Sequence, residues 1–293
     1  MPINSSIVGI TGQPVTALVD ARWMMAYAAA LNDSLQCYFD TRRAEGIHPH
    51  PLFPVCFEWP AVTALFRELR DSGLTLAEAQ RGVHASHDLT IHRAPRPGET
   101  LTTSASIIGL EYRKPGAYSV SRLDTVGSNH EPICTTLYGT LYRGVQVNGT
   151  ASPISPSDNA TRRTSAATPP RREISIAVPA GAAHVYTECA RIWNPIHTDA
   201  LVAENAGLPE IILHGTATLA LSVSRVLNCE ANDDPRRVAR IAARFGAMVP
   251  MPSNLTLRIL AREEASDGAR IYFESLNSEG APAIRDGLVI LRA

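Results

Sequence analysis

The stretch from residue 149 to residue 172 limits what this chain can fold into more than any other part of its sequence. It reads GTASPISPSDNATRRTSAATPPRR, and Ile154 is its single large apolar residue. Such a segment buries too little apolar surface to offset the entropy lost on ordering. We therefore expect a linker or mobile loop at 149–172. It would separate an N-terminal domain at 1–148 from a C-terminal domain at 173–293, each of the size of one compact domain.

Composition excludes several classes of protein. Hydrophobic residues make up 45% of the 293 residues, enough for a core, and the net charge is −1. A balanced charge gives no basis for binding nucleic acid or an anionic membrane, so a small molecule is the favoured partner. The first residues lack the pattern of a secretion signal, and no apolar run reaches the roughly 20 residues that span a bilayer. We expect a cytoplasmic protein.

Cysteine and histidine spacing predicts no metal site. The five cysteines form no C-x-x-C pair and are odd in number, which is typical of reduced, mostly buried thiols. His84, His87 and His92 are spaced like alternating residues of a strand rather than like metal ligands.

The C-terminal domain has the pattern of a buried helix followed by strands. Residues 216–227 (TATLALSVSRVL) are small and apolar almost all around, which is typical of a helix enclosed by other structure. We expect Leu219 and Val223 to be fully buried there. Strands are predicted at 173–178, 240–245, 255–262, 271–276 and 283–291.

The N-terminal domain repeats this order. Apolar helical segments at 23–31 and 61–69 precede strand-like runs at 101–110, 118–123 and 135–145. A helix followed by antiparallel strands, an order that occurs in both halves of the chain, predicts an α+β fold. Each half would be an antiparallel sheet wrapped around a central helix.

The most informative region lies between residues 186 and 227. A residue before proline avoids the α conformation, so Asn194-Pro195 predicts a stiff turn just ahead of His197. A histidine held there, beside an amphipathic segment at 199–206, is well placed to transfer protons near neutral pH. The competing interpretation is a capping or structural histidine.

His214-Gly215 directly precedes the apolar helix. The first backbone N–H groups of a helix lack partners within the helix, and its dipole favours negative charge there. Since residue 215 has no side chain, a thioester carbonyl can approach its N–H closely, as an oxyanion site requires. Alternatively, the glycine only lets the helix pack without a clash.

These residues carry a family resemblance. N-P-I-H-T-D, then A-x-x-x-G-L-P-x-I-I-x-H-G, resembles the MaoC-like dehydratases and (R)-specific enoyl-CoA hydratases of the hydratase 2 type. Residues 82–101 resemble the N-terminal domain of two-domain members. The resemblance implies a double hot-dog fold, a thioester ligand, reversible addition of water to an enoyl double bond, and no cofactor. The positions in register are Tyr186, Asn194, Pro195, His197, Asp199, Gly207, His214 and Gly215.

One departure from the family pattern affects the chemistry. The family pairs its histidine with an aspartate five residues earlier, where this chain has Ile192, and the preceding glycine is Arg191. The usual hydration mechanism therefore cannot be carried over intact. An isoleucine beside His197 excludes water and disfavours the imidazolium, so we expect a neutral histidine that acts as a base.

Three explanations of this departure are open. In the first, His197 alone catalyses the reaction of an activated substrate. In the second, a carboxylate from elsewhere in the chain replaces the aspartate. In the third, the site binds a ligand without catalysing hydration. The candidate carboxylates are Asp33, Glu188 and Asp199, although Asp199 is also placed to cap the following helix. In the first half Asp33 stands at the aspartate position and Tyr38 at the histidine position, so each half keeps what the other lost.

These observations favour a hydro-lyase acting on a β-hydroxyacyl or enoyl thioester in specialised biosynthesis. His197 is the acid–base residue, the Gly215 N–H is the oxyanion donor, and Asn194 completes the catalytic set. The expected partner is a CoA or carrier-protein thioester, and a homodimer is an assembly that the sequence allows. The alternatives are a catalytically silent acyl-thioester-binding protein and a thioesterase. Residues expected to line the substrate are Tyr186, Ile192, Trp193 and His214.

Overall fold

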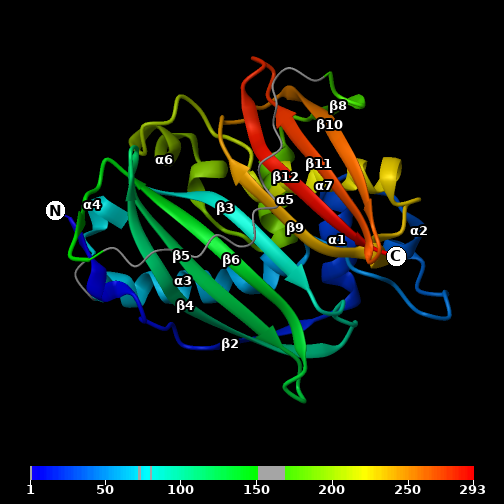
Figure 1. The fold of residues 1–293 in the computed structure, drawn as a ribbon, viewed down its shortest axis with the longest axis horizontal. Helices are drawn as coiled ribbons and strands as arrows, with labels where there is room; N and C mark the ends of the chain where they lie inside the picture. Colours follow the sequence, from blue (N-terminus) through cyan, green and yellow to red (C-terminus); the bar gives the residue numbers. More distant parts are fainter. Residues whose placement is uncertain (1, 72–73, 80, 151–168) are drawn as a thin grey trace. The chain divides into compact units, whose positions relative to one another are not determined.

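The computed structural model describes residues 2–71, 74–79, 81–150 and 169–293. In its C-terminal part an antiparallel sheet wraps around one buried helix. The strands are β8 (Arg172–Val178), β9 (Val238–Phe245), β10 (Ser253–Ala265), β11 (Gly268–Leu276) and β12 (Pro282–Arg292). Their spatial order is β9-β12-β11-β10-β8 (Figure 1). Helix α7 (Gly215–Glu230) contacts β10, β11 and β12.

A second antiparallel sheet is built from the N-terminal part of the chain. Its strands are β2 (Val15–Val19), β3 (Gly82–Ile91), β4 (Glu99–Arg113), β5 (Gly116–Val126) and β6 (Pro132–Arg143), in the order β2-β4-β5-β6-β3. Helix α3 (Pro54–Asp71) packs its apolar residues against this sheet. The short elements are η1 (Ser5–Ile7), α4 (Leu76–Ala79) and the parallel pair β1 (Ile3–Asn4) and β7 (Val147–Asn148).

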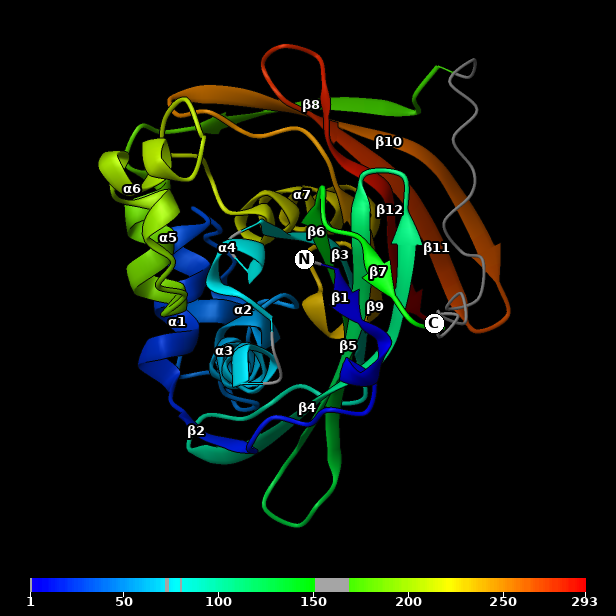
Figure 2. The ribbon, with the colours of Figure 1, turned by 90° about the vertical axis from the view of Figure 1, so that its left-hand side faces the viewer.

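The contacts divide the chain into two units. The first comprises the described parts of Met1–Leu18, Phe57–Arg93 and Thr100–Ala160, and the second those of Val19–Cys56, Ala94–Glu99 and Thr161–Ala293. Helices α1 (Ala21–Ala30) and α2 (Gln36–Phe39) therefore belong with the second unit, where α1 lies beside α5 (Ala182–Ala190) (Figure 2). The linker predicted at 149–172 lies largely outside the described residues, and the domain division stays a prediction.

The central helix of the second unit is buried as its sequence predicts. Leu219 and Val223 are both 0% exposed. Its small polar residues also find partners, since the Ser222 hydroxyl donates to the Thr218 carbonyl oxygen at 2.8 Å and lies 2.7 Å from the Ser275 hydroxyl of β11. The polar side chains of this helix, which has no solvent-facing stripe, therefore find hydrogen-bond partners in the helix itself and in the sheet around it.

The predicted segments coincide with observed elements, but the prediction omits helix α5, strand β2 and, among the long strands, β3. Its histidines and the irregular register between His84 and Ser86 interrupt the alternation of apolar residues that marks a strand. All five cysteines are free thiols. No helix in the described part of the chain is long and apolar enough to cross a membrane.

A carboxyl group is buried in the core of the first unit. Glu58 of α3 is 2% exposed, and its Oε1 accepts hydrogen bonds from the Thr136 hydroxyl at 2.7 Å and the Cys134 thiol at 3.5 Å. Burial raises the pKa of Glu58 from 4.5 to about 7, although both hydrogen bonds lower it. The carboxyl group is therefore easier to accommodate protonated than charged.

We predict that Glu58 makes stability fall between pH 4.5 and pH 7. In that range the unfolded chain has lost a proton that the folded chain keeps, so the folded state loses about 3 kcal/mol, at roughly 1.4 kcal/mol per pKa unit. Glu58→Gln should remove this dependence and unfold at higher urea concentration than wild type at pH 8. The exposed Glu279→Gln is the control. A difference in stability between wild type and Glu58→Gln that is the same at pH 5 and pH 8 would contradict the assignment.

Candidate active site

The chain leaves α5 through a backbone conformation that fixes the following turn. Arg191 ends the helix in the left-handed region at φ 59°, and the Ile192 N–H donates to the Thr187 carbonyl oxygen at 3.1 Å. The Asn194 side-chain oxygen then accepts the Ile196 N–H at 3.4 Å and begins η2 (Pro195–His197). Asn194 thus holds the turn that positions His197.

The ring of His197 is held by a hydrogen bond to a backbone carbonyl. Its Nδ1 lies 2.8 Å from the Ile212 carbonyl oxygen, which can only accept, so Nδ1 carries the proton and Nε2 keeps a free lone pair. Burial lowers the pKa of His197 to about 4, although this hydrogen bond raises it. The residue is therefore neutral at pH 7, as the isoleucine five residues earlier in the sequence predicts, and its Nε2 can accept a proton.

A second histidine stacks on the first at the start of α7. The ring centroids of His197 and His214 are 3.7 Å apart, and the rings are inclined by 26°. Nε2 of His214 lies 3.2 Å from the Thr187 hydroxyl. Burial, and then the neighbouring His197, lower the pKa of His214 to about 2. The buried, apolar surroundings of the two stacked rings favour the neutral form of both histidines.

Gly215, the first residue of α7, packs closely against Phe245. A Cβ atom at this position would lie 3.0 Å from the Phe245 ring, closer than such contacts normally are. Packing against Phe245 is by itself a sufficient reason for a glycine at position 215. The same missing side chain leaves the N–H at the helix N-terminus open to a carbonyl oxygen.

Tyr186 belongs to a buried hydrogen-bonded pair of tyrosines. It is 1% exposed, donates to the Thr216 hydroxyl at 3.1 Å, and lies 3.3 Å from the hydroxyl of Tyr27. Burial raises the pKa of Tyr186. The pair joins α1 to α5 and to the first turn of α7, so Tyr186 is tied to the residues that surround the two histidines.

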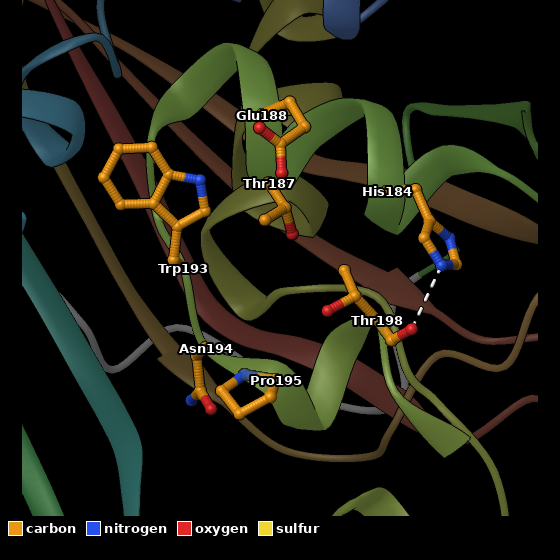
Figure 3. A pocket seen from close by; sticks show the side chains of 7 residues that line it. All are labelled: His184, Thr187, Glu188, Trp193, Asn194, Pro195 and Thr198. Atoms are coloured by element: carbon orange, nitrogen blue, oxygen red, sulfur yellow. Dashed lines mark hydrogen bonds between the residues drawn. The ribbon is translucent and has the colours of Figure 1, made fainter.

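A small pocket of about 230 Å³ lies between α5 and the segment from Trp193 to Thr198 (Figure 3). Trp193 is 62% exposed at this pocket, and Glu188 is exposed on α5. Nε2 of His184 lies 3.1 Å from the Thr198 carbonyl oxygen. The lining residues are His184, Thr187, Glu188, Trp193, Asn194, Pro195 and Thr198.

The predicted carboxylates lie at three different places. The Asp199 side chain accepts the Val202 N–H at 3.1 Å and caps α6 (Ala200–Asn205), and Glu188 borders the pocket. Asp33 lies near Ser224, ten residues beyond His214 along α7. At a rise of about 1.5 Å per residue these helix positions are roughly 15 Å apart. The structure therefore does not bring Asp33 together with His197.

The two halves share a local backbone pattern that fixes their correspondence. Asn32, at φ 50°, ends α1 as Arg191 ends α5, and each next residue donates its N–H to the carbonyl oxygen five positions earlier. Asp33 therefore occupies the backbone position of Ile192. The guanidinium of Arg191 lies 4.1 Å over the Trp23 ring. Sequence reasoning missed this contact, together with Thr187 and His50, because partners far apart in the chain carry no local signal.

Comparisons with known proteins agree with this architecture. Residues 162–279 match the family model of the MaoC like domain, and residues 6–136 match the FAS1-like dehydratase domain region. Enoyl-CoA hydratase 2, peroxisomal, of Arabidopsis thaliana is 31% identical over 100 residues, which is 34% of this chain and 31% of that protein. The chain thus spans less than a third of this relative's length.

Solved structures show the fold. A MaoC-like dehydratase from Phytophthora capsici superimposes with a TM-score of 0.82 at 19% identity, over 97% of this chain and 96% of its own. A Mycobacterium tuberculosis protein described as a double hotdog fold gives 0.62 at 15% identity, over 97% and 96%. The chain is an α+β double hot-dog protein whose second half matches the MaoC like domain and whose first half matches the FAS1-like dehydratase domain region.

Proposed function

We propose that this protein is a hydro-lyase that interconverts a β-hydroxyacyl thioester and the enoyl thioester, with His197 as its acid–base residue. The observation that carries the proposal is the hydrogen bond from Nδ1 of His197 to the Ile212 carbonyl oxygen, which leaves Nε2 unprotonated beside the start of α7. The family and the name of the Arabidopsis relative support a thioester substrate, carried by CoA or a carrier protein.

In the dehydrating direction Nε2 accepts the proton from Cα of the substrate. The electron pair moves through the thioester carbonyl, whose oxygen gains negative charge near the Gly215 N–H. The Cα–Cβ double bond then forms as the Cβ–O bond breaks, and the imidazolium returns its proton to the departing hydroxide, which leaves as water. One positioned group therefore serves as base and then as acid.

The residue at position 192 decides which substrates react. Ile192 is 6% exposed and supplies no carboxylate to orient a water molecule. An activated substrate, whose α-proton is acidified by a second carbonyl or extended conjugation, reacts without that help, which favours a specialised biosynthetic role. Asn194 holds the turn, and Tyr186, Trp193 and His214 line or support the substrate site. The cytoplasmic location and a homodimer stay predictions.

Mixing the intact protein with crotonyl-CoA and following the enoyl absorbance separates the candidate functions. Loss of absorbance with formation of 3-hydroxybutyryl-CoA supports the hydro-lyase. Release of free CoA instead supports a thioesterase, and binding without either product supports a silent binding protein. An activated substrate with a second carbonyl is tested in parallel.

Removing the ring of His197 should abolish most of the turnover. We predict that His197→Ala lowers kcat by about 10²-fold or more, the scale of a lost acid–base group, while the fold is kept. Stopped-flow or steady-state assays with matched circular dichroism measure both effects. The control is His92→Ala in the first unit, and wild-type turnover in His197→Ala would refute the mechanism.

Restoring the carboxylate should shift the enzyme towards simple substrates. We predict that Ile192→Asp raises hydration of crotonyl-CoA and lowers stability by about 1–3 kcal/mol, because a polar group is buried without built partners. Ile192→Asn, which adds polarity without charge, is the matched control. If wild type already hydrates crotonyl-CoA well and Ile192→Asp adds nothing, another carboxylate acts at the site.

Gly215 can be tested separately as a packing residue and as a donor. We predict that Gly215→Ala lowers stability by about 1–3 kcal/mol, because its Cβ meets the Phe245 ring. Phe245→Leu in the same chain should restore stability. If turnover stays low once stability returns, close approach to the N–H is what the glycine provides; full recovery of both would leave packing as its role.

A further inference from the structure

A chain of three hydroxyl groups runs from α1 to the first turn of α7. The hydroxyl of Tyr27 lies 3.3 Å from that of Tyr186, which in turn donates to the hydroxyl oxygen of Thr216 at 3.1 Å. Because Tyr186 uses its single proton in the bond to Thr216, Tyr27 is the donor in the bond between the two tyrosines. Both protons are therefore directed towards Thr216.

The hydroxyl proton of Thr216 has no acceptor in the described part of the chain. Two other hydroxyl groups of α7 donate to the carbonyl oxygen four residues earlier, Thr218 to His214 at 3.1 Å and Ser222 to Thr218 at 2.8 Å. Among the described residues, the Thr216 side chain makes only the hydrogen bond that it accepts from Tyr186. Thr216 is also partly exposed, whereas Thr218 is buried. Its proton is thus available to a ligand.

Thr216 lies next to the residues that carry the proposed reaction. It directly follows Gly215 at the start of α7. The ring of its partner Tyr186 has its centroid 5.0 Å from that of His214, which stacks on His197. Tyr186 therefore contacts Thr216 through its hydroxyl and the pair of histidines through its ring.

The two tyrosines make the Thr216 hydroxyl a stronger donor. In a buried chain each hydrogen bond polarises the next, by roughly 10–30% per bond. Tyr27 and Tyr186 are 0% and 1% exposed, so water does not compete for their protons. Burial raises the pKa of both tyrosines, which keeps their hydroxyls protonated at neutral pH. A donor polarised in this way suits an oxygen that gains negative charge.

We propose that the Thr216 hydroxyl is a second donor to the thioester carbonyl oxygen, beside the Gly215 N–H. Tyr186 and Tyr27 are positioning residues that orient and polarise this hydroxyl. The proposal rests on the proposed function, because it requires a thioester whose carbonyl oxygen gains charge. It also gives the N-terminal half of the sequence, through Tyr27 of α1, a part in the reaction.

A ligand that forms an enolate without being turned over tests this donor. Acetoacetyl-CoA loses a Cα proton to solvent and becomes an enolate with its own absorbance, whereas butyryl-CoA binds without ionising. We expect the wild-type protein to raise the enolate fraction of bound acetoacetyl-CoA above that of the free ligand at the same pH. Thr216→Val, which removes the hydroxyl at nearly constant shape, should lower the ratio of bound enolate to bound neutral ligand about tenfold or more, the scale of a hydrogen bond to a charged group.

Further variants separate donation from packing. Thr216→Ser keeps a hydroxyl and should restore the ratio, while Tyr186→Phe and Tyr27→Phe should cause smaller losses, the second smaller than the first. Thr63→Val is the matched control, because this half-buried threonine of α3 donates to the Pro60 carbonyl oxygen. Calorimetry with butyryl-CoA should show much smaller changes, since a neutral carbonyl oxygen binds a donor more weakly than an oxyanion does.

Equal enolate ratios in wild type and Thr216→Val would overturn the assignment. So would a wild type that does not favour the enolate, or a loss of affinity in Thr216→Val that is the same for both ligands. Unfolding curves check that each variant folds. A protein that binds neither thioester would contradict the proposed function and the assignment with it. One that binds both without hydrating crotonyl-CoA would contradict only the reaction, and the enolate ratio would still decide the role of Thr216.

Discussion

Burial of α7 is the constraint on which the rest of the second unit depends. Its apolar residues are enclosed by β10, β11 and β12, so the helix cannot shift without opening the core. Its first residues present His214 and Gly215 to the His197 turn, and its middle presents Ser224 to His50. One helix thus fixes two polar clusters that are roughly 15 Å apart along its length.

The two clusters differ in what they can do with a proton. At the start of α7 two stacked neutral histidines lie beside an apolar residue, and the free Nε2 of His197 makes that cluster a base. Further along, Oδ2 of Asp33 and the hydroxyl of Tyr38 are buried and have no hydrogen-bond partner among the described residues. This division follows from two exchanges of residue type between the halves. Ile192 corresponds to Asp33 of the first half, and Tyr38 corresponds to His197 of the second half.

Local patterns in the sequence predict what depends on neighbours along the chain. The apolar run of α7, the Asn194-Pro195 turn, and the cap that Asp199 supplies to α6 all follow from short spacings. Features that depend on distant partners do not. His50 meets Ser224 across 174 residues, and Glu58 meets Thr136 across 78, so neither contact leaves a signal in a single sequence. The pKa values follow from burial that only the folded chain creates.

The protonation state of His197 distinguishes an apolar site from one with an acidic partner, because a carboxylate beside the ring would raise its pKa and an apolar wall lowers it. Nuclear magnetic resonance of the protein labelled with ¹⁵N-histidine, with His197 assigned from His197→Ala, reports both the tautomer and the titration. We predict a neutral ring at pH 7 with the proton on Nδ1 and a midpoint near pH 4. A midpoint at or above about 6.5, the value of a free histidine, would contradict it and point to an acidic partner at the site.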